Sequence, residues 1–243
     1  MVTTRHLAWE GAFNARDLGG LPTTDGGTTL PGAVVRSDAP DDLTAAGWAG
    51  LWAHGVRTVL DLREPDEIPA ERVAPDWVTV VRVPLDDRGD TAFWQYCADN
   101  GLSSGTPLYY GPFLRRKADR CVAAIEAIAD APPGGVLVHC ASGRDRTGLI
   151  SLLLLALAGV EAAAIVADYE LSEERLRPAF AALGWRDQGP LIRELLARRN
   201  TSAEAEILSL LETLDIEAVL RAAGLGETRL AAVRARLLGE RAE

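Results

Sequence analysis

A cysteine and an arginine separated by five residues are the positions best suited to chemistry in this sequence. Cys140 follows the apolar segment Val136-Leu137-Val138, and Arg146 stands where a long apolar helix is expected to begin. Between a strand and a helix the backbone has to curl, and its N–H groups then form a nest for an anion at the positive end of the helix dipole. Such a nest fits a phosphate dianion and favours the thiolate form of Cys140, which is a nucleophile.

The residues around this pair predict the rest of the site. Arg146 can grip two phosphoryl oxygens with its planar fork. The Thr147 hydroxyl is placed to donate a hydrogen bond to the thiolate, and we expect His139 to hold the loop by hydrogen bonds instead of transferring protons. The predicted phosphate-binding set is Ala141, Ser142, Gly143, Arg144, Asp145 and Arg146.

The loop carries a resemblance to a known family. Its pattern His-Cys-x-x-Gly-x-x-Arg-Thr-Gly resembles the phosphate-binding loop of the protein tyrosine phosphatase superfamily. Four further blocks resemble the bacterial tyrosine phosphatases related to the triple-specificity enzymes, which act on phosphotyrosine, phosphoserine/threonine and phosphoinositides. These blocks are Asn14 to Gly20, Arg36 to Asp38, Asp61 to Arg63 and Ala167 to Ser172. That subfamily usually has Lys where this chain has Arg144, a change in reach and geometry that bears on substrate preference.

The resemblance implies a two-step hydrolysis of phosphate monoesters through a phosphocysteine on Cys140, with an Asp as acid and then base. In the resembled subfamily the loop Asp is proposed to transfer the proton, which corresponds to Asp145, and we favour it because the loop ties it to the bound phosphate. Elsewhere in the superfamily the acid lies on a separate loop, for which Asp86 and Asp87 are the alternatives. The implied substrate is a phosphorylated protein or a phosphoinositide, and no metal or organic cofactor is expected.

Composition bears on nucleic-acid binding, metal and disulfide content, and membrane association. The 243-residue chain has a net charge of −10, which argues against nucleic-acid binding. Three cysteines without metal-ligand spacing indicate neither zinc nor a disulfide framework, and a cytoplasmic location is the simplest expectation. The N-terminus does not resemble a signal peptide. The longest apolar run, Gly148 to Val160, is shorter than the roughly 20 residues that span a bilayer, so we expect no integral membrane association. The oligomeric state stays open.

The elements that must position these residues alternate between strand and helix. Strands are expected over 33–37, 56–62, 78–85 and 136–138. Helices are expected over 43–54, 112–130, 147–159, 161–171, 189–199, 203–213 and 215–239, the last with breaks at Gly224 and Gly226. This order predicts an α/β fold with a central, mostly parallel sheet of four to five strands flanked by helices, plus a helical C-terminal extension. We expect one domain, with a core over about 10–172 and the extension over about 173–243. Residues 86–112 are expected to form a long irregular functional loop.

Three further groups of residues outside the loop are less specific in what they predict. The block Asn14 to Gly20 is expected to serve turns and packing, and Arg63 with Glu67 to form a scaffold salt bridge. The basic run Arg115-Arg116-Lys117 is expected to be a solvated helix face or, beside an anionic pocket, a contact for headgroups.

Two rival functions remain open. A catalytically silent phosphate-binding module would keep the loop without turnover. A rhodanese-type sulfurtransferase also uses a cysteine-headed loop, although that loop is generally one residue shorter.

Overall fold

The computed structural model of the chain describes residues 5–70, 74–102, 105–184 and 186–239. The described residues contain a five-stranded sheet in the order β1-β2-β5-β3-β4. β1 is antiparallel to β2, and the other neighbouring strands are parallel. This confirms the predicted α/β fold with a mostly parallel sheet. The strands are β1 (Arg16–Asp17), β2 (Val34–Ser37), β3 (Val56–Asp61), β4 (Thr79–Arg82) and β5 (Gly135–His139).

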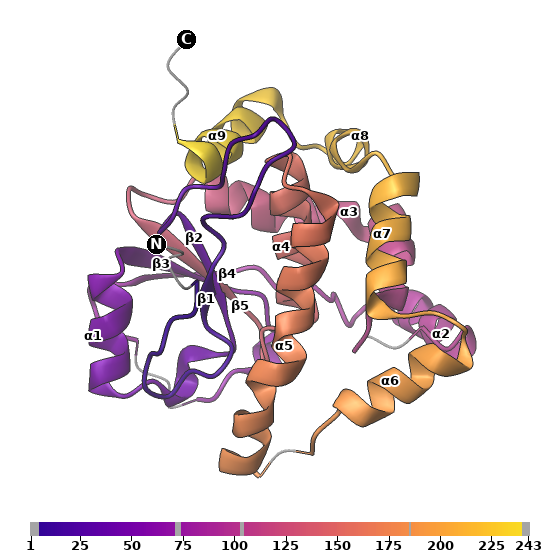
Figure 1. Cartoon of the computed structure of the whole chain (residues 1–243), viewed down its shortest axis with the longest axis horizontal. Coiled ribbons are helices and arrows are strands. Elements are labelled where there is room, and N and C mark those ends of the chain that lie inside the picture. The colour runs from indigo at the N-terminus through magenta and orange to yellow at the C-terminus, as the bar shows by residue number, and fades with distance from the viewer. Residues whose placement is uncertain (1–4, 71–73, 103–104, 185, 240–243) are drawn as a thin grey trace.

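Helices cover both faces of the sheet (Figure 1). The α-helices are α1 (Ala45–Ala53), α2 (Thr91–Asp99), α3 (Tyr110–Ala129), α4 (Arg146–Leu157), α5 (Ala162–Ala182), α6 (Gly189–Arg198), α7 (Ala203–Thr213), α8 (Ile216–Ala222) and α9 (Glu227–Leu238). Short 3₁₀ turns are η1 (Pro40–Asp42), η2 (Pro65–Glu67) and η3 (Pro107–Tyr109). One apolar layer lies between the sheet and α1, and a larger one between the sheet and the helices that follow β4.

The central strand β5 shows why both layers exist. Val136 and Val138 point into the larger layer and Leu137 into the smaller one, as the two-residue period of a strand requires. The register pairs His139 with Ser37 of β2 and with Asp61 of β3. The carboxyl ends of β2, β3 and β5 therefore meet at one edge of the sheet, where α/β proteins commonly bind ligands.

Two segments differ from the sequence-based prediction. Residues 86–112 are not one irregular loop, because helix α2 lies within them; the Asp90 side chain caps it by accepting from the Phe93 N–H, at 3.0 Å. Phe93 and Cys97, one turn apart, are buried in the core. Helix α5 also runs on to Ala182, so a single helix crosses the expected boundary at 172/173.

The C-terminal helices share the larger core layer. Leu220 of α8 and Leu230, Val233 and Leu237 of α9 are buried in it. Both helices contact α3 and α4. These contacts favour our proposal of one continuous domain, in which the C-terminal segment is part of the core.

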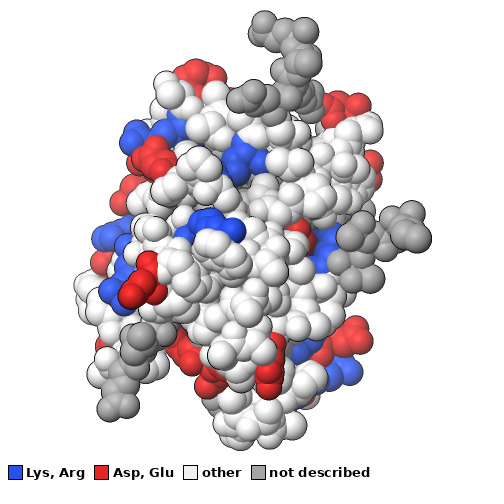
Figure 2. Space-filling view, turned by 90° about the vertical axis from the view of Figure 1, so that its left-hand side faces the viewer, with Lys and Arg blue, Asp and Glu red and all other residues white. Residues whose placement is uncertain are grey.

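The face shown in Figure 2, on the α1 side of the molecule, carries separate charges of both signs among neutral residues. The described residues visible there form no continuous area of Lys and Arg. Within the described residues, no helix combines the length and the apolar character needed to cross a bilayer.

Candidate active site

The loop between β5 and α4 turns at Gly143. Its φ is +66°, a left-handed conformation that glycine adopts without the cost paid by other residues. A Cβ at this position would lie 2.1 Å from the Ser37 carbonyl oxygen, so the loop passes directly against the end of β2. Cys140, at the start of the loop, is only 2 % exposed. The turn predicted around Cys140 and Arg146 is thus packed against the carboxyl edge of the sheet.

The carbonyl groups of the loop are held from outside by neighbouring elements. The donors are the Ala39 N–H on Ala141 (2.9 Å), the Asn14 amide on Ser142 (3.0 Å), the Arg36 guanidinium on Gly143 and Arg144 (2.8 and 3.3 Å) and the Tyr110 hydroxyl on Asp145 (2.8 Å). In a planar trans peptide the N–H points opposite to the C=O. Carbonyls held from outside therefore turn the following N–H groups toward the opposite side of the loop, the arrangement that an anion nest requires.

Arg36 is itself fixed by a buried ionic cluster. Its Nη1 donates to Asp168 Oδ2 at 2.8 Å, and Arg5 and Arg16 reach Oδ1 of the same carboxylate at 2.8 and 3.1 Å. Burial acts to raise the pKa of Asp168, but the three arginines hold it below its ordinary value. Arg16 also donates to the Asn14 side chain, at 2.6 Å. The block that we expected to serve turns and packing thus also holds the loop.

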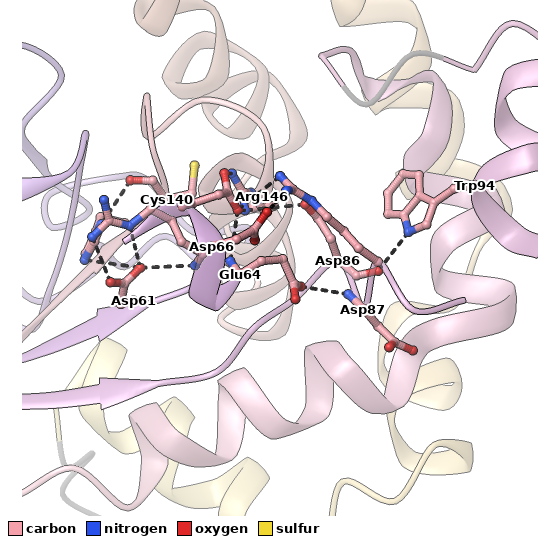
Figure 3. A network of polar contacts seen from close by, with 12 residues as sticks. Asp61, Glu64, Asp66, Asp86, Asp87, Trp94, Cys140 and Arg146 are labelled. Atoms are coloured by element: carbon pink, nitrogen blue, oxygen red, sulfur yellow. Dashed lines mark hydrogen bonds and ion pairs between the residues drawn. The ribbon is translucent and has the colours of Figure 1, made fainter. Parts of the chain in front are cut away.

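Arg146 lies between two carboxylates beside Cys140 (Figure 3). Its guanidinium donates to both oxygens of Glu67, at 2.5 and 2.8 Å, and its Nη1 lies 3.4 Å from Asp86 Oδ2. Burial would lower the pKa of Arg146, but Glu67, Cys140 and Asp86 keep it above its ordinary value, so the side chain stays charged.

The expected Arg63–Glu67 salt bridge is wrong. Arg63 pairs with Asp61 and Asp41, at 2.9 and 2.5 Å. The chain turns through η2 immediately after Arg63, and this turn carries Glu67 toward the loop. Glu67 thereby becomes the partner of Arg146.

The three candidate acids lie in different surroundings. Arg144 Nε donates to Asp145 Oδ1 at 3.2 Å. Asp87 pairs with Lys117 and Arg120, and the Lys117 hydrogen bond lowers its pKa. Asp86 faces Arg146, and burial raises its pKa to about 6 even though Arg146 opposes the shift. Burial thus lets Asp86 keep its proton up to a pH of about 6.

His139, Thr147 and Arg144 complete the predicted set. His139 is fully buried, with Nδ1 3.0 Å from the Cys140 carbonyl oxygen and Nε2 3.7 Å from Asp61 Oδ1. The Thr147 hydroxyl is buried and makes no hydrogen bond to any described residue, so the expected bond to the Cys140 sulfur is not formed here. Arg144 donates to Gln188 at 2.9 Å, which connects the loop to the start of α6.

The basic run on α3 is not the uniform solvated face that we expected. Arg115 and Arg116 are exposed, whereas Lys117 is buried and paired with Asp87 and Asp90. All three cysteines are buried free thiols. The described residues contain no group of three or more His, Cys, Asp or Glu side chains arranged to hold a metal ion.

Sequence reasoning did not find several residues that support the site. Asn14, Arg36 and Asp168 lay in blocks that the resemblance singled out, but nothing in those blocks indicated contact with the loop. Tyr110 carried no signal, and Glu67 was expected to pair with Arg63; their partners in the structure lie 35 and 79 positions away.

The α/β fold and the cysteine-headed loop agree with comparison to known proteins. A model of the tyrosine phosphatase family matches residues 7–239. The chain therefore belongs to the tyrosine phosphatase family, whose members are hydrolases of phosphorylated substrates. This confirms the family resemblance noted in the sequence.

Three proteins illustrate the likeness. A Cupriavidus necator protein to which tyrosine-protein phosphatase activity is ascribed is 35 % identical over 72 % of this chain and 66 % of its own length. The triple specificity protein phosphatase PtpB of Mycobacterium tuberculosis is 31 % identical, covering 68 % of each chain. A tyrosine-protein phosphatase of Nostoc commune is 33 % identical over 61 % of this chain and 51 % of its own. The matched segments thus span about two thirds of the first two relatives and about half of the third.

Proposed function

We propose that this protein is a metal-independent phosphatase that hydrolyses phosphate monoesters through a phosphocysteine on Cys140. The observation that carries the proposal is the loop whose carbonyls are held outward by donors from β2, α3 and the N-terminal segment. With Arg146 at its end, this loop offers a fixed set of donors for the three charged oxygens of a phosphoryl group. A silent phosphate-binding module would need the nest, but it would not need a nucleophile inside it.

The chemistry divides into two steps. In the first, the Cys140 sulfur attacks phosphorus in line, the bond from phosphorus to the leaving oxygen breaks, and a carboxylic acid gives its proton to that oxygen. In the second, water attacks the phosphocysteine, its proton returns to the carboxylate, and the S–P bond breaks to release phosphate and the thiolate. Arg146 balances the charge on the phosphoryl oxygens in both steps.

The identity of the acid is proposed from its surroundings. Asp145, favoured by the sequence, accepts a hydrogen bond from Arg144 at 3.2 Å. Asp86 is enclosed near Arg146 with a pKa of about 6. These observations support Asp86 as the proton donor. We assign Asp145 the role of holding Arg144, and Asp87 that of a structural ion pair with Lys117.

The proposed substrate is phosphotyrosine in proteins, with phosphoserine/threonine and phosphoinositides as further possibilities. The family match and the relatives named as tyrosine phosphatases support the first. PtpB, named for triple specificity, supports testing the others. We also propose that the protein acts in the reducing cytoplasm, because its nucleophilic thiol has to stay unoxidised.

The test is a panel of phosphotyrosine, phosphoserine and phosphoinositide substrates, assayed for released phosphate with EDTA present. We expect turnover that EDTA does not reduce, and no thiocyanate formation from thiosulfate and cyanide. The control is Cys140→Ser, which should bind phosphate but lose turnover by about 1000-fold or more, because a hydroxyl is hardly ionised at neutral pH. Turnover by the Ser variant at a tenth of the wild-type rate would contradict the proposed nucleophile, and thiosulfate activity would favour the sulfurtransferase.

A further inference from the structure

The chain's single lysine occupies an unusual position in α3. Lys117 lies at a kink in this 20-residue helix, where its backbone angles (φ −136°, ψ 28°) depart from helical values. Its side chain is only 5 % exposed. Lysine is rarely buried unless it is paired, since an unpaired ammonium in the interior is costly. The position therefore calls for specific partners.

Those partners are two carboxylates on the segment that also carries Asp86. The Lys117 Nζ lies 3.0 Å from Asp87 Oδ2 and 2.9 Å from Asp90 Oδ2. It also lies 5.5 Å from the centre of the Phe93 ring, in α2. A single ammonium thus joins α3 to both ends of the short segment from Asp87 to Asp90.

Each of the two carboxylate residues is tied further into this segment. Asp87 has a φ of +48°, and its N–H donates to Glu64 Oε1 at 2.9 Å. Asp90 caps helix α2 through its side chain, and its own N–H donates to the Asp87 carbonyl oxygen at 3.0 Å. The segment is thereby anchored to η2 on one side and to α2 on the other, with Lys117 behind it.

Asp86 is the residue that this arrangement presents to the loop. The Asp86 carbonyl oxygen accepts a hydrogen bond from Trp94 Nε1 at 3.2 Å, and the Asp86 carboxylate lies 3.4 Å from Arg146 Nη1. Figure 3 shows Asp87 following Asp86 on the side away from Arg146. Displacing Asp87 would therefore move the backbone that aims Asp86 at the site.

We propose that Lys117 is a positioning residue: its contacts with Asp87 and Asp90 hold Asp86 beside Arg146 for proton transfer to the leaving group. The inference rests on the proposed function. An ion pair between a buried ammonium and partly exposed carboxylates contributes little net stability, but it fixes one geometry. Arg120 cannot replace it, because Arg120 is 39 % exposed and reaches Asp87, at 3.2 Å, without an ion pair to Asp90.

The test compares a poor leaving group with a good one. Lys117→Met keeps an unbranched side chain of similar length and removes its charge. The control is Arg115→Met, which removes an exposed cation from the same helix. We expect Lys117→Met to lower kcat on a phosphotyrosine peptide by about tenfold or more and on p-nitrophenyl phosphate by less than about threefold, because only the first leaving group needs a proton. Arg115→Met should leave both rates unchanged.

A double-mutant cycle separates positioning from general scaffolding. If Lys117 acts through Asp86, Lys117→Met should lower the phosphotyrosine rate by less than about twofold when it is introduced into Asp86→Asn. Equal losses on both substrates, or an undiminished loss in the Asp86→Asn background, would overturn the inference. So would an Asp86→Asn variant whose loss does not depend on the leaving group.

Two further measurements keep the outcome interpretable. Asp87→Asn with Asp90→Asn removes the negative charges from the same contacts, so it should reproduce the leaving-group dependence if Lys117→Met does not fold. A folded wild-type protein that releases no phosphate would refute the proposed function itself. By contrast, an active wild type with a Lys117→Met variant that behaves normally would refute only the positioning role.

Discussion

The site holds a carboxyl, Asp86, close to a guanidinium of opposite charge, Arg146. Asp86 and Arg146 are both largely buried and lie within 3.4 Å, yet burial raises the pKa of Asp86 to about 6. The other charges facing Asp86 are Glu67 and Glu64, which raise its pKa, and Arg88, which lowers it. The result is a carboxyl that holds a proton over a range in which an exposed Asp, with a pKa of about 4, has lost it.

This proton should be visible in the pH dependence of the reaction. If Asp86 is the acid, kcat/KM for a phosphotyrosine peptide should fall as the pH rises through about 6, because the protonated fraction falls. Asp86→Asn should remove this falling limb and slow phosphotyrosine far more than p-nitrophenyl phosphate, by about 100-fold against severalfold. Asp145→Asn, measured alongside, should keep the limb. If the falling limb of the pH profile is lost only in Asp145→Asn, the acid is Asp145 and not Asp86.

At the scale of elements, the loop is shaped by contacts from outside it. Gly143 presses against the Ser37 carbonyl oxygen, and the neighbouring carbonyls are held by β2, α3 and the N-terminal segment. The nest is therefore a property of several packed elements, and the strand and helix on either side of it would not form it alone.

Gly143→Ala tests this dependence on close packing. The new Cβ would lie 2.1 Å from a backbone oxygen, so the loop must shift. We expect turnover to fall by about 100-fold or more, because the preorganised donors move, and added phosphate should no longer raise the Tm. The matched control is Gly184→Ala, since Gly184 also has a φ of +66° but open space around it. It should cost only about 1–2 kcal/mol of stability and leave kcat unchanged. Equal activity of Gly143→Ala and Gly184→Ala would contradict the inference that the loop depends on close packing against Ser37.

The sequence predicted the parts of the site that lie close together along the chain. The strand, the loop and the helix from Val136 onward are local, so the spacing of Cys140 and Arg146 was informative. The contacts that hold the loop join residues far apart, such as Asn14 with Ser142, and no local pattern carries that information. Asp86 was one of three candidate acids in the sequence, and the burial that distinguishes it depends on how α2 and η2 pack.

At the scale of the whole molecule, the C-terminal helices complete the core. Leu230 is fully buried among residues of the larger apolar layer, and the Leu30 N–H donates to the Leu237 carbonyl oxygen at 2.6 Å. The strand and helix alternation predicted the sheet correctly. The same pattern predicted the helical C-terminal extension within one domain, but it could not reveal that α8 and α9 contact α3 and α4.

The contribution of this region can be measured by thermal or urea unfolding. Leu230→Ala should lower the free energy of unfolding by about 2–5 kcal/mol, because it leaves a cavity in the core. Leu191→Ala, at a position that is 45 % exposed, should change it by no more than about 0.5 kcal/mol. If Leu230→Ala unfolds like the wild type, the C-terminal helices are not part of the cooperative unit.

The meeting of three arginines on Asp168 has a consequence for how the chain is made. Arg36 and its carboxylate partner are separated by 132 positions. At roughly 5–20 residues per second, a ribosome needs on the order of ten seconds to travel that distance. Throughout this interval the nascent chain carries Arg5, Arg16 and Arg36 without the anion that neutralises them in the finished protein. Arg16 and Arg36, both buried in the finished protein, can therefore gain their carboxylate partner only after Asp168 of α5 has been synthesised.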